Sequence, residues 1–154
     1  MEKSQFTDLV EKGFNHIPLS REIFVDTDTA LALYLKLANT PYSYFLESVQ
    51  GGEKWGRYSF IGLSAETVIK VNDFEVLIEK NGHLHQQLKV EDPLDWIQDY
   101  QAQFKVPQLE NLPDFNGGLV GYFGYEIIRY IEPKLKNIGT TIKLSCLWHP
   151  FCLI

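Results

Sequence analysis

Three polar residues near the middle of the sequence carry groups that could recognise a small charged ligand. Glu47 offers a carboxylate to an ammonium group, Ser48 offers a hydroxyl that donates and accepts, and Arg57 offers a planar cation to a carboxylate. A free amino acid carries both complementary charges. The same residues also permit a plainer interpretation, in which the glutamate ends a strand in water, the serine begins a turn and the arginine is solvated.

Other polar clusters in the sequence lack a complete catalytic or metal-binding pattern. His83 and His85 could share one strand face but have no third ligand nearby, and we interpret them as surface residues. The set Cys146, His149 and Cys152 lacks an evident fourth ligand. No Ser-His-Asp or Cys-His constellation can be assigned from the sequence. We therefore expect neither a metal site nor a catalytic residue in this chain.

Composition and charge narrow the classes of function. The 154 residues are 45% hydrophobic and 22% charged, which is typical of a soluble globular domain and unlike a disordered chain. A net charge of -6 without a cluster of lysines and arginines argues against binding to the phosphates of nucleic acid. We expect a folded domain without a nucleic-acid partner.

The sequence also indicates a cytoplasmic protein without a membrane partner. Its longest apolar runs, 30–37 and 148–154, are far shorter than the roughly 20 residues of a membrane-spanning helix. Residues 1–5 are polar and do not begin a secretory signal. The two cysteines are too few for the disulfide framework of a small secreted domain.

Two predicted strands must position the candidate amino-acid site. Residues 42–47 and 57–62 are rich in aromatic and β-branched side chains, so Glu47 ends one strand and Arg57 begins the next. Three further strands of the same type are expected at 67–71, 74–79 and 83–88.

Turn residues separate these later strands. Residues 71–74 and 80–83 both resemble hairpin turns, and Asn81-Gly82 is the stronger signal because a type I′ turn needs positive φ at both central positions. Successive hairpins predict an antiparallel meander.

Helical patterns flank the strands. Residues 26–37 begin with capping Asp and Thr residues and continue with apolar side chains on most sides, which predicts one buried helix ending before Pro41. Asp92-Pro93 begins an amphipathic helix to about Phe104 that should cover one sheet face. A connection at 105–115 then leads to a strand at 116–122 and a short helix at 125–131. Because strands and helices do not alternate strictly, we predict an α+β fold, largely an antiparallel sheet with flanking helices.

Two longer segments resemble one protein family. They are FLESVQGGEKWGRYSFIG at 45–62 and NGGLVGYFGYE at 116–126. Both resemble anthranilate synthase component I, in the same order as in that family, and the likeness covers roughly residues 26–133. The resemblance implies that residues 1–138 form the N-terminal regulatory domain of this family. Residues 139–154 depart from the family pattern, and we interpret them as an atypical tail arising from truncation or a frameshift.

The resemblance also gives the candidate site a ligand. In the family, the Leu-Glu-Ser strand end lines a site for the feedback inhibitor L-tryptophan, which favours a ligand role for Glu47 and Ser48. The role of Arg57 stays open, because the family varies between lysine and arginine there. Three neighbours are expected to shape the same pocket: Trp55, Gly56 and Tyr58.

The resemblance implies chemistry that this chain does not carry by itself. The intact enzyme is a lyase that converts chorismate to anthranilate and pyruvate, using Mg2+ and ammonia delivered by a glutamine amidotransferase component II. The residues that hold chorismate and Mg2+ belong to a catalytic domain without a counterpart here, so we expect the isolated chain to be inactive.

Three alternatives remain open. The chain could be the corresponding part of aminodeoxychorismate synthase component I, from the folate pathway. It could instead be a stand-alone amino-acid-binding module, or a remnant without function that leaves a large interface exposed.

Overall fold

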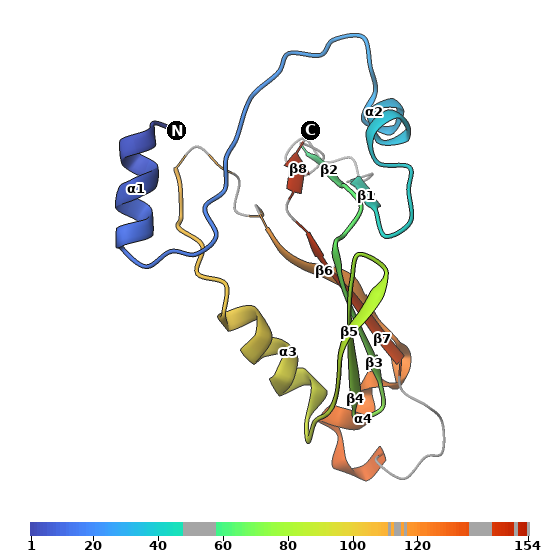
Figure 1. The fold of residues 1–154 in the computed structure, drawn as a ribbon. Helices are drawn as coiled ribbons and strands as arrows, with labels where there is room; N and C mark the ends of the chain where they lie inside the picture. The colour runs from blue at the N-terminus through green and yellow to red at the C-terminus, as the bar shows by residue number, and fades with distance from the viewer. Residues whose placement is uncertain are drawn as a thin grey trace. The chain divides into compact units, whose positions relative to one another are not determined.

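The computed structural model describes residues 1–47, 58–110, 112, 115, 117–135, 143–149 and 151–153 (Figure 1), of which residues 133, 143–149 and 151–153 are described by their backbone alone. The chain divides into two compact units. Unit 1 comprises residues 1–64, 103–117 and 150–154, and unit 2 comprises residues 65–102 and 118–149.

Unit 1 contains a three-stranded antiparallel sheet in the order β1-β2-β8. Its strands are β1 (Tyr44–Glu47), β2 (Ser59–Gly62) and β8 (Phe151–Leu153). The register pairs Tyr44 with Gly62 at one end of β1 and Glu47 with Ser59 at the other. The expected strands at 42–47 and 57–62 are therefore both present, with slightly later starts.

The helix α1 (Lys3–Glu11) opens unit 1 and was not anticipated from the sequence. A capping box closes its first turn, in which the Gln5 side chain accepts a hydrogen bond from the backbone N-H of Glu2 at 3.1 Å. After the helix, Asn15 binds a distant part of the chain: its Nδ2 donates to the carbonyl of Gln103 and its Oδ1 accepts from the backbone N-H of Lys105, both at 2.7 Å.

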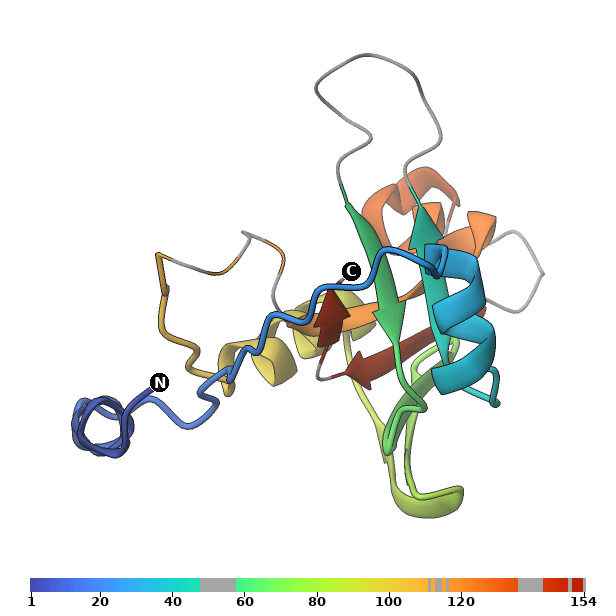
Figure 2. The same ribbon diagram turned by 90° about the horizontal axis from the view of Figure 1, so that it is seen from above.

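The helix α2 (Ala30–Leu37) begins as predicted with a threonine cap, since Thr29 Oγ1 accepts a hydrogen bond from the Ala32 backbone N-H at 3.1 Å. Figure 2 shows α2 alongside β1, where Tyr34 stacks on Phe45 with ring centres 5.6 Å apart. The prediction of a buried helix is wrong, because no residue of α2 is buried. Its apolar residues lie on most sides, and the elements of unit 1 pack on only part of that surface. Three leucines stay exposed: Leu31, Leu35 and Leu37.

Unit 2 contains a five-stranded antiparallel sheet in the order β5-β4-β3-β7-β6. Its strands are β3 (Thr67–Asn72), β4 (Glu75–Lys80), β5 (His83–Lys89), β6 (Gly118–Phe123) and β7 (Lys143–His149). The predicted meander is confirmed for β3, β4 and β5, which pair in sequence order. A β-bulge at Ile78 and Glu79 shifts the register of the edge strand β5.

Of the two hairpin turns predicted from the sequence, one lies where expected and the other is shifted by one residue. Asn81 and Gly82 have φ of 51° and 78°, which confirms positive φ at both central positions of the β4–β5 turn. The β3–β4 turn lies one residue later than expected, because Asn72 still pairs with Glu75. Asp73, with φ of 50°, therefore opens the two-residue loop.

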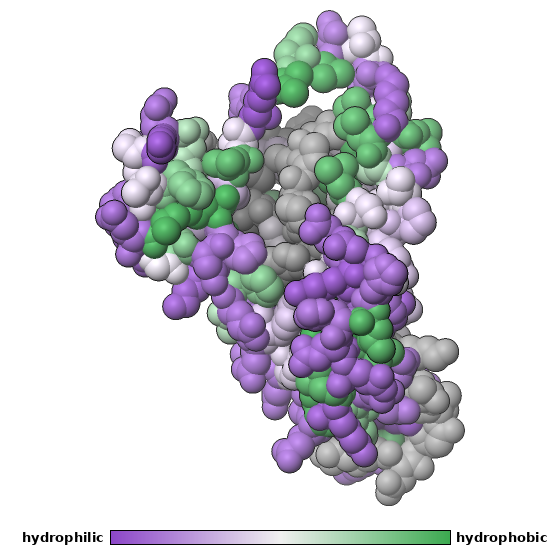
Figure 3. Space-filling view, viewed as in Figure 1, coloured by the Kyte–Doolittle hydropathy of each residue, from purple (hydrophilic) through white to green (hydrophobic). Residues whose placement is uncertain are grey.

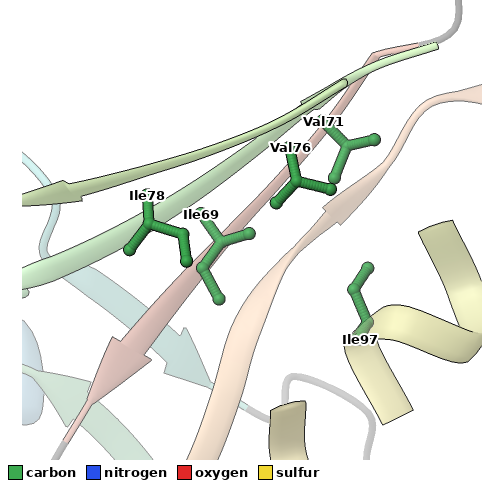
Figure 4. Close-up of a cluster of buried hydrophobic side chains, with 5 residues drawn as sticks. All are labelled: Ile69, Val71, Val76, Ile78 and Ile97. Atoms are coloured by element: carbon green, nitrogen blue, oxygen red, sulfur yellow. The ribbon is translucent and has the colours of Figure 1, made fainter. Parts of the chain in front are cut away.

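The core of unit 2 forms where the sheet meets α3 (Pro93–Ala102). Asp92 Oδ1 caps this helix by accepting a hydrogen bond from the Leu94 backbone N-H at 2.8 Å. Figure 4 shows the cluster of five buried side chains, four from β3 and β4 and one from α3: Ile69, Val71, Val76, Ile78 and Ile97. The expectation that a helix starting at Asp92-Pro93 covers a sheet face is thus confirmed.

Short helices follow β6 where one was predicted. They are η1 (Tyr125–Ile127), α4 (Ile128–Ile131) and η2 (Pro133–Leu135). The buried guanidinium of Arg129 pairs with Glu126, with Nε and Oε2 3.0 Å apart. The Tyr130 hydroxyl donates a hydrogen bond to the carbonyl of Asp73, and its ring meets Phe74 edge to face. This contact holds α4 against the β3–β4 turn.

The α+β class is confirmed by helices combined with antiparallel sheets. The sequence assigned no strand to residues 139–154, yet β7 lies between β3 and β6 and β8 pairs with β2. The boundary at residue 138 and the interpretation of the tail stay predictions. Within the described ranges, every helix is too short or too polar to cross a bilayer.

Candidate functional site

The end of β1 presents the one charged member of the candidate site that the structure describes. Glu47 is exposed and lies opposite Ser59 of β2, so both side chains share one face of the sheet. Ser59 Oγ lies 3.5 Å from Glu47 Oε1, the outer limit of a hydrogen bond. The carboxylate therefore keeps most of its accepting capacity for another group.

The sheet below this carboxylate is packed on both faces. Phe45, on the face of Glu47, stacks on Tyr34 of α2. On the opposite face, Phe60 meets Phe115 edge to face with ring centres 5.0 Å apart. Ile61 of β2 is fully buried. These contacts fix the strand ends, so the direction of Glu47 is set by a rigid element rather than by a loop.

A tight contact between Tyr44 and Gly62 holds the other end of the same strand pair. A methyl group at Gly62 would lie 2.5 Å from Cδ1 and 2.6 Å from Cζ of the tyrosine ring, well inside van der Waals contact. The reason for a glycine here is steric, because the Tyr44 ring fills the space of a side chain. It is not conformational, because Gly62 does not have positive φ. Burial raises the pKa of the Tyr44 hydroxyl well above its usual range, so the ring stays neutral under the scaffold of the site.

The remaining predicted members of the site are only partly placed. Tyr58 is exposed and lies directly before Ser59, the first residue of β2. The others lie outside the described residues: Ser48, Trp55, Gly56 and Arg57. The structure thus brings together Glu47 and the start of β2, and the closed amino-acid pocket stays a prediction.

What Glu47 can do chemically is limited by its exposure. A solvated carboxylate attracts an ammonium group with a free energy of about 1 kcal/mol or less, because water screens the pair. Saturable binding of an amino acid requires further donors for the ligand carboxylate and apolar cover for its side chain. The 48–57 connection contains residue types suited to both tasks, a guanidinium and an indole.

A separate cavity in unit 1 escaped the sequence analysis. It has a volume of about 370 Å³ and lies beside α1. Its apolar wall includes Leu9, Pro18 and Leu109, and its only ionised side chain, Asp8, is already paired with Lys12 at 2.7 Å. The lining includes none of the candidate amino-acid site, and nothing in it indicates a ligand.

The described residues contain no cluster of three or more metal-ligating side chains. Among them, no three side chains of His, Cys, Asp or Glu gather closely enough to hold a metal ion. The resemblance implies that the Mg2+ ligands belong to the catalytic domain.

The second family-like segment forms an exposed aromatic surface in unit 2. Tyr122 and Phe123 at the end of β6 are exposed, and Tyr125 in η1 is 90% exposed. In the sequence, this segment carries the family resemblance and predicts no exposed surface. Alternation along β6 predicts one outward-facing aromatic ring, but not two consecutive exposed rings at its end.

Comparison with other proteins finds close relatives. No protein-family profile matches the chain. It is 50% identical over 137 residues to anthranilate synthase component 1 of Pseudomonas aeruginosa, which covers 89% of the chain and 28% of the relative. It is 43% identical over 152 residues to the protein of the same name in Neisseria gonorrhoeae, covering 99% of the chain and 31% of the relative. The Acinetobacter calcoaceticus protein of that name is 46% identical over 139 residues, which cover 88% of the chain and 28% of the relative. The chain therefore spans less than a third of the length of each.

Proposed function

The chain is related to anthranilate synthase component 1 over most of its length, and from this premise we propose that it forms the regulatory and scaffold part of such an enzyme. In this proposal the intact protein converts chorismate to anthranilate and pyruvate in tryptophan biosynthesis. The catalytic residues and Mg2+ lie in the part of the relatives that this chain does not span. Its relatives are named for the anthranilate enzyme, which does not favour the aminodeoxychorismate alternative.

The ligand of this part is proposed to be L-tryptophan. The observation that carries this assignment is Glu47, an exposed carboxylate held at the end of a packed strand within the family-like segment 45–62. Its free acceptor positions suit the ammonium group of the inhibitor. Ser48 and Arg57 supply hydroxyl and guanidinium donors in the adjoining sequence, and Trp55, Gly56 and Tyr58 complete the pocket.

Feedback control follows if tryptophan binds two states of the enzyme with unequal affinity. A ligand shifts a conformational equilibrium only by its differential affinity for the two states. A site that ends two neighbouring strands is suited to this role, because a small change at the strand ends is carried along the packed sheet. The further partner in this proposal is a glutamine amidotransferase component II that supplies ammonia, in the cytoplasm.

A calorimetric titration of L-tryptophan into the whole chain tests the proposed site. We expect saturable binding that Glu47→Gln weakens by up to about fivefold, since it removes the charge that attracts the ammonium group. Ser48→Ala should weaken it by about tenfold, since it removes one hydrogen bond to a charged group. Glu75→Gln is the matched control: Glu75 is an exposed carboxylate on β4 that accepts a hydrogen bond from Gln87 at 2.7 Å. D-tryptophan serves as the stereochemical control.

The outcomes separate the proposals. Equal weakening by Glu47→Gln and Glu75→Gln would remove Glu47 from the site. No binding by a folded sample would place essential contacts in the part of the protein beyond this chain, which rules out a stand-alone amino-acid-binding module. We also expect no anthranilate fluorescence when the chain is incubated with chorismate, Mg2+ and ammonia, and turnover would contradict the assignment of catalysis to the other part.

A further inference from the structure

Residues 19–25, within the segment between α1 and α2, leave several large apolar side chains in water. Leu19 and Ile23 are 73% and 72% exposed, and Phe24 is 91% exposed. The segment runs as a thread without helix or strand (Figure 1), and hydrophobic residues gather along it at the top of Figure 3. Single exposed apolar residues are ordinary, but several large ones in sequence mark an interaction surface.

The backbone of this segment has no partner in the described part of the chain either. Within the part of the chain that the structure describes, residues 19–25 take part in no hydrogen bond and no ion pair. Backbone N-H and C=O groups next to exposed apolar side chains need partners once those side chains are covered. The partner of this segment must therefore supply hydrogen bonds as well as apolar contact.

Both ends of the segment are anchored. Upstream, the backbone N-H groups of Asn15 and His16 donate to the carbonyl of Lys105, in addition to hydrogen bonds of the Asn15 side chain. Downstream, Thr29 caps α2 and Asp28 pairs with Lys36 at 2.6 Å. The segment is thus a strap with fixed ends and an unpartnered middle, which lowers the entropy lost when a partner orders it.

The last three residues of the strap are of the types found in a strand covered on both faces, whereas residues 20–22 are polar. Ile23, Phe24 and Val25 are β-branched or aromatic and favour extended backbone. Because side chains alternate along a strand, Ile23 and Val25 face one side while Phe24 faces the other. A strand with apolar residues on both faces is typical of the interior of a layered sheet rather than of a solvated edge.

We propose that residues 19–25 become a β-strand by pairing with a sheet edge in the part of anthranilate synthase component 1 that this chain does not span. This inference rests on the proposed function, and it names the surface through which the two parts join. The occupant follows from length: the relatives are more than three times as long as the region matched here. Within the described residues, the edge strands β1 and β8 of unit 1 pair only with β2 and not with the strap.

Hydrogen-deuterium exchange compares the strap in the isolated chain and in a full-length context. The context is a chimera in which this chain replaces the matched 152 residues of the Neisseria gonorrhoeae relative. We expect alternate amides among residues 22–25, those that face the paired edge, to exchange at least about 100-fold more slowly in the chimera than in the isolated chain. The unmodified Neisseria relative provides the same measurement at the aligned residues if the chimera does not fold.

A substitution tests the apolar contact in the same two contexts. Phe24→Asp leaves the melting temperature of the isolated chain unchanged, because the ring is already in water, and lowers that of the chimera by several degrees. Leu84→Asp is the matched control, since Leu84 is an exposed apolar residue on the edge strand β5. We expect that control to have the same effect in both contexts.

The outcomes test the pairing of the strap separately from the proposed function of the enzyme. Protection of residues 22–25 together with a context-dependent effect of Phe24→Asp supports the proposal. A chimera that produces anthranilate but leaves these amides unprotected would overturn the strap and leave the proposed function standing. Concentration-dependent dimers of the isolated chain that Phe24→Asp converts to monomers would assign the strap to a second copy, which also overturns the proposal.

Discussion

Both units expose apolar side chains, but among the described residues unit 2 has a larger buried hydrophobic core than unit 1. In unit 2, five hydrophobic side chains from two neighbouring strands and α3 form one buried cluster. In unit 1, Ile61 and Ala38 are the buried hydrophobic residues among those described, while the leucines of α2 and the side chains of the strap stay in water. The candidate amino-acid site belongs to unit 1, which has few buried hydrophobic residues among those described.

This difference suggests which unit carries regulation. Elements that move or bind come from the less stable parts of a protein, because a ligand must be able to shift their equilibrium. Unit 2 has the packing of a scaffold. Unit 1 has the packing of an element whose stability depends on what binds to it, and tryptophan and the remaining part of the enzyme are the proposed ligands.

The largest expected effect is in the core of unit 2. Ile69→Ala removes three carbons from a fully buried side chain on β3 and should lower the free energy of unfolding by about 4 kcal/mol. Urea denaturation measures the loss. Leu84→Ala, an exposed substitution on β5, should change it by less than about 0.5 kcal/mol. Similar losses from both variants would show that unit 2 is not the packed scaffold described above.

A substitution under the candidate site should have an intermediate effect. Gly62→Ala places a methyl group against the Tyr44 ring and should cost about 2 kcal/mol through overpacking. Amide exchange should accelerate in β1 and β2, with less change in β3. Tyr44→Ala creates space, so the double variant should be more stable than the sum of the two single effects predicts. Strictly additive effects would disprove the steric explanation.

The anchor of the strap should contribute less. Asn15→Ala removes three side-chain hydrogen bonds in an exposed setting, to Gln103, Lys105 and His16, and should cost about 1 kcal/mol. Trypsin cleavage after Arg21 should then be about fivefold faster, because the strap is released at one end more often. Asn39→Ala, at an exposed asparagine after α2, is the control. Equal cleavage rates in both variants would show that Asn15 does not hold the strap.

The smallest effect is a dependence on pH in unit 2. Burial raises the pKa of Tyr130 from 10.0 to about 12, with Asp73 and Asp92 adding to the shift and Arg129 opposing it. Between these values the unfolded chain loses the proton while the folded chain keeps it, so the stability present below pH 10 declines as the pH rises toward 12. Tyr130→Phe should flatten this decline in urea midpoints measured from pH 9 upward. Equal slopes in variant and parent would contradict the shift.

Much of the sheet could be predicted from the sequence because its signals are local. The β-branched residues of β3 and β4 and the Asn81-Gly82 turn before β5 are such signals, and only the first turn moved by one residue. The helix α1 also carried a local signal, with a capping box and apolar residues at Phe6, Leu9 and Val10, and was overlooked. The exposure of α2 could not be predicted in this way, because it depends on which elements pack against the helix.

In the candidate site too, local features could be predicted from the sequence, whereas contacts between strands could not. The sequence located Glu47 at a strand end, and the structure agrees. The partnership with Ser59 and the steric demand of Tyr44 on Gly62 come from the register between strands, which no single segment reveals. The role of Ser48 and Arg57 stays a prediction.

The position of β7 sets the order in which unit 2 can assemble during synthesis. Its backbone pairs with β3, as in Thr67 with Trp148, and with β6, as in Phe123 with Leu144. The meander of β3, β4 and β5 consists of local hairpins and can form while the rest of the chain is still being translated. The strand β6 must wait on the ribosome without a neighbour, its aromatic end accessible, until β7 emerges to join it to the sheet. Chaperones that hold nascent chains would therefore meet this protein at β6.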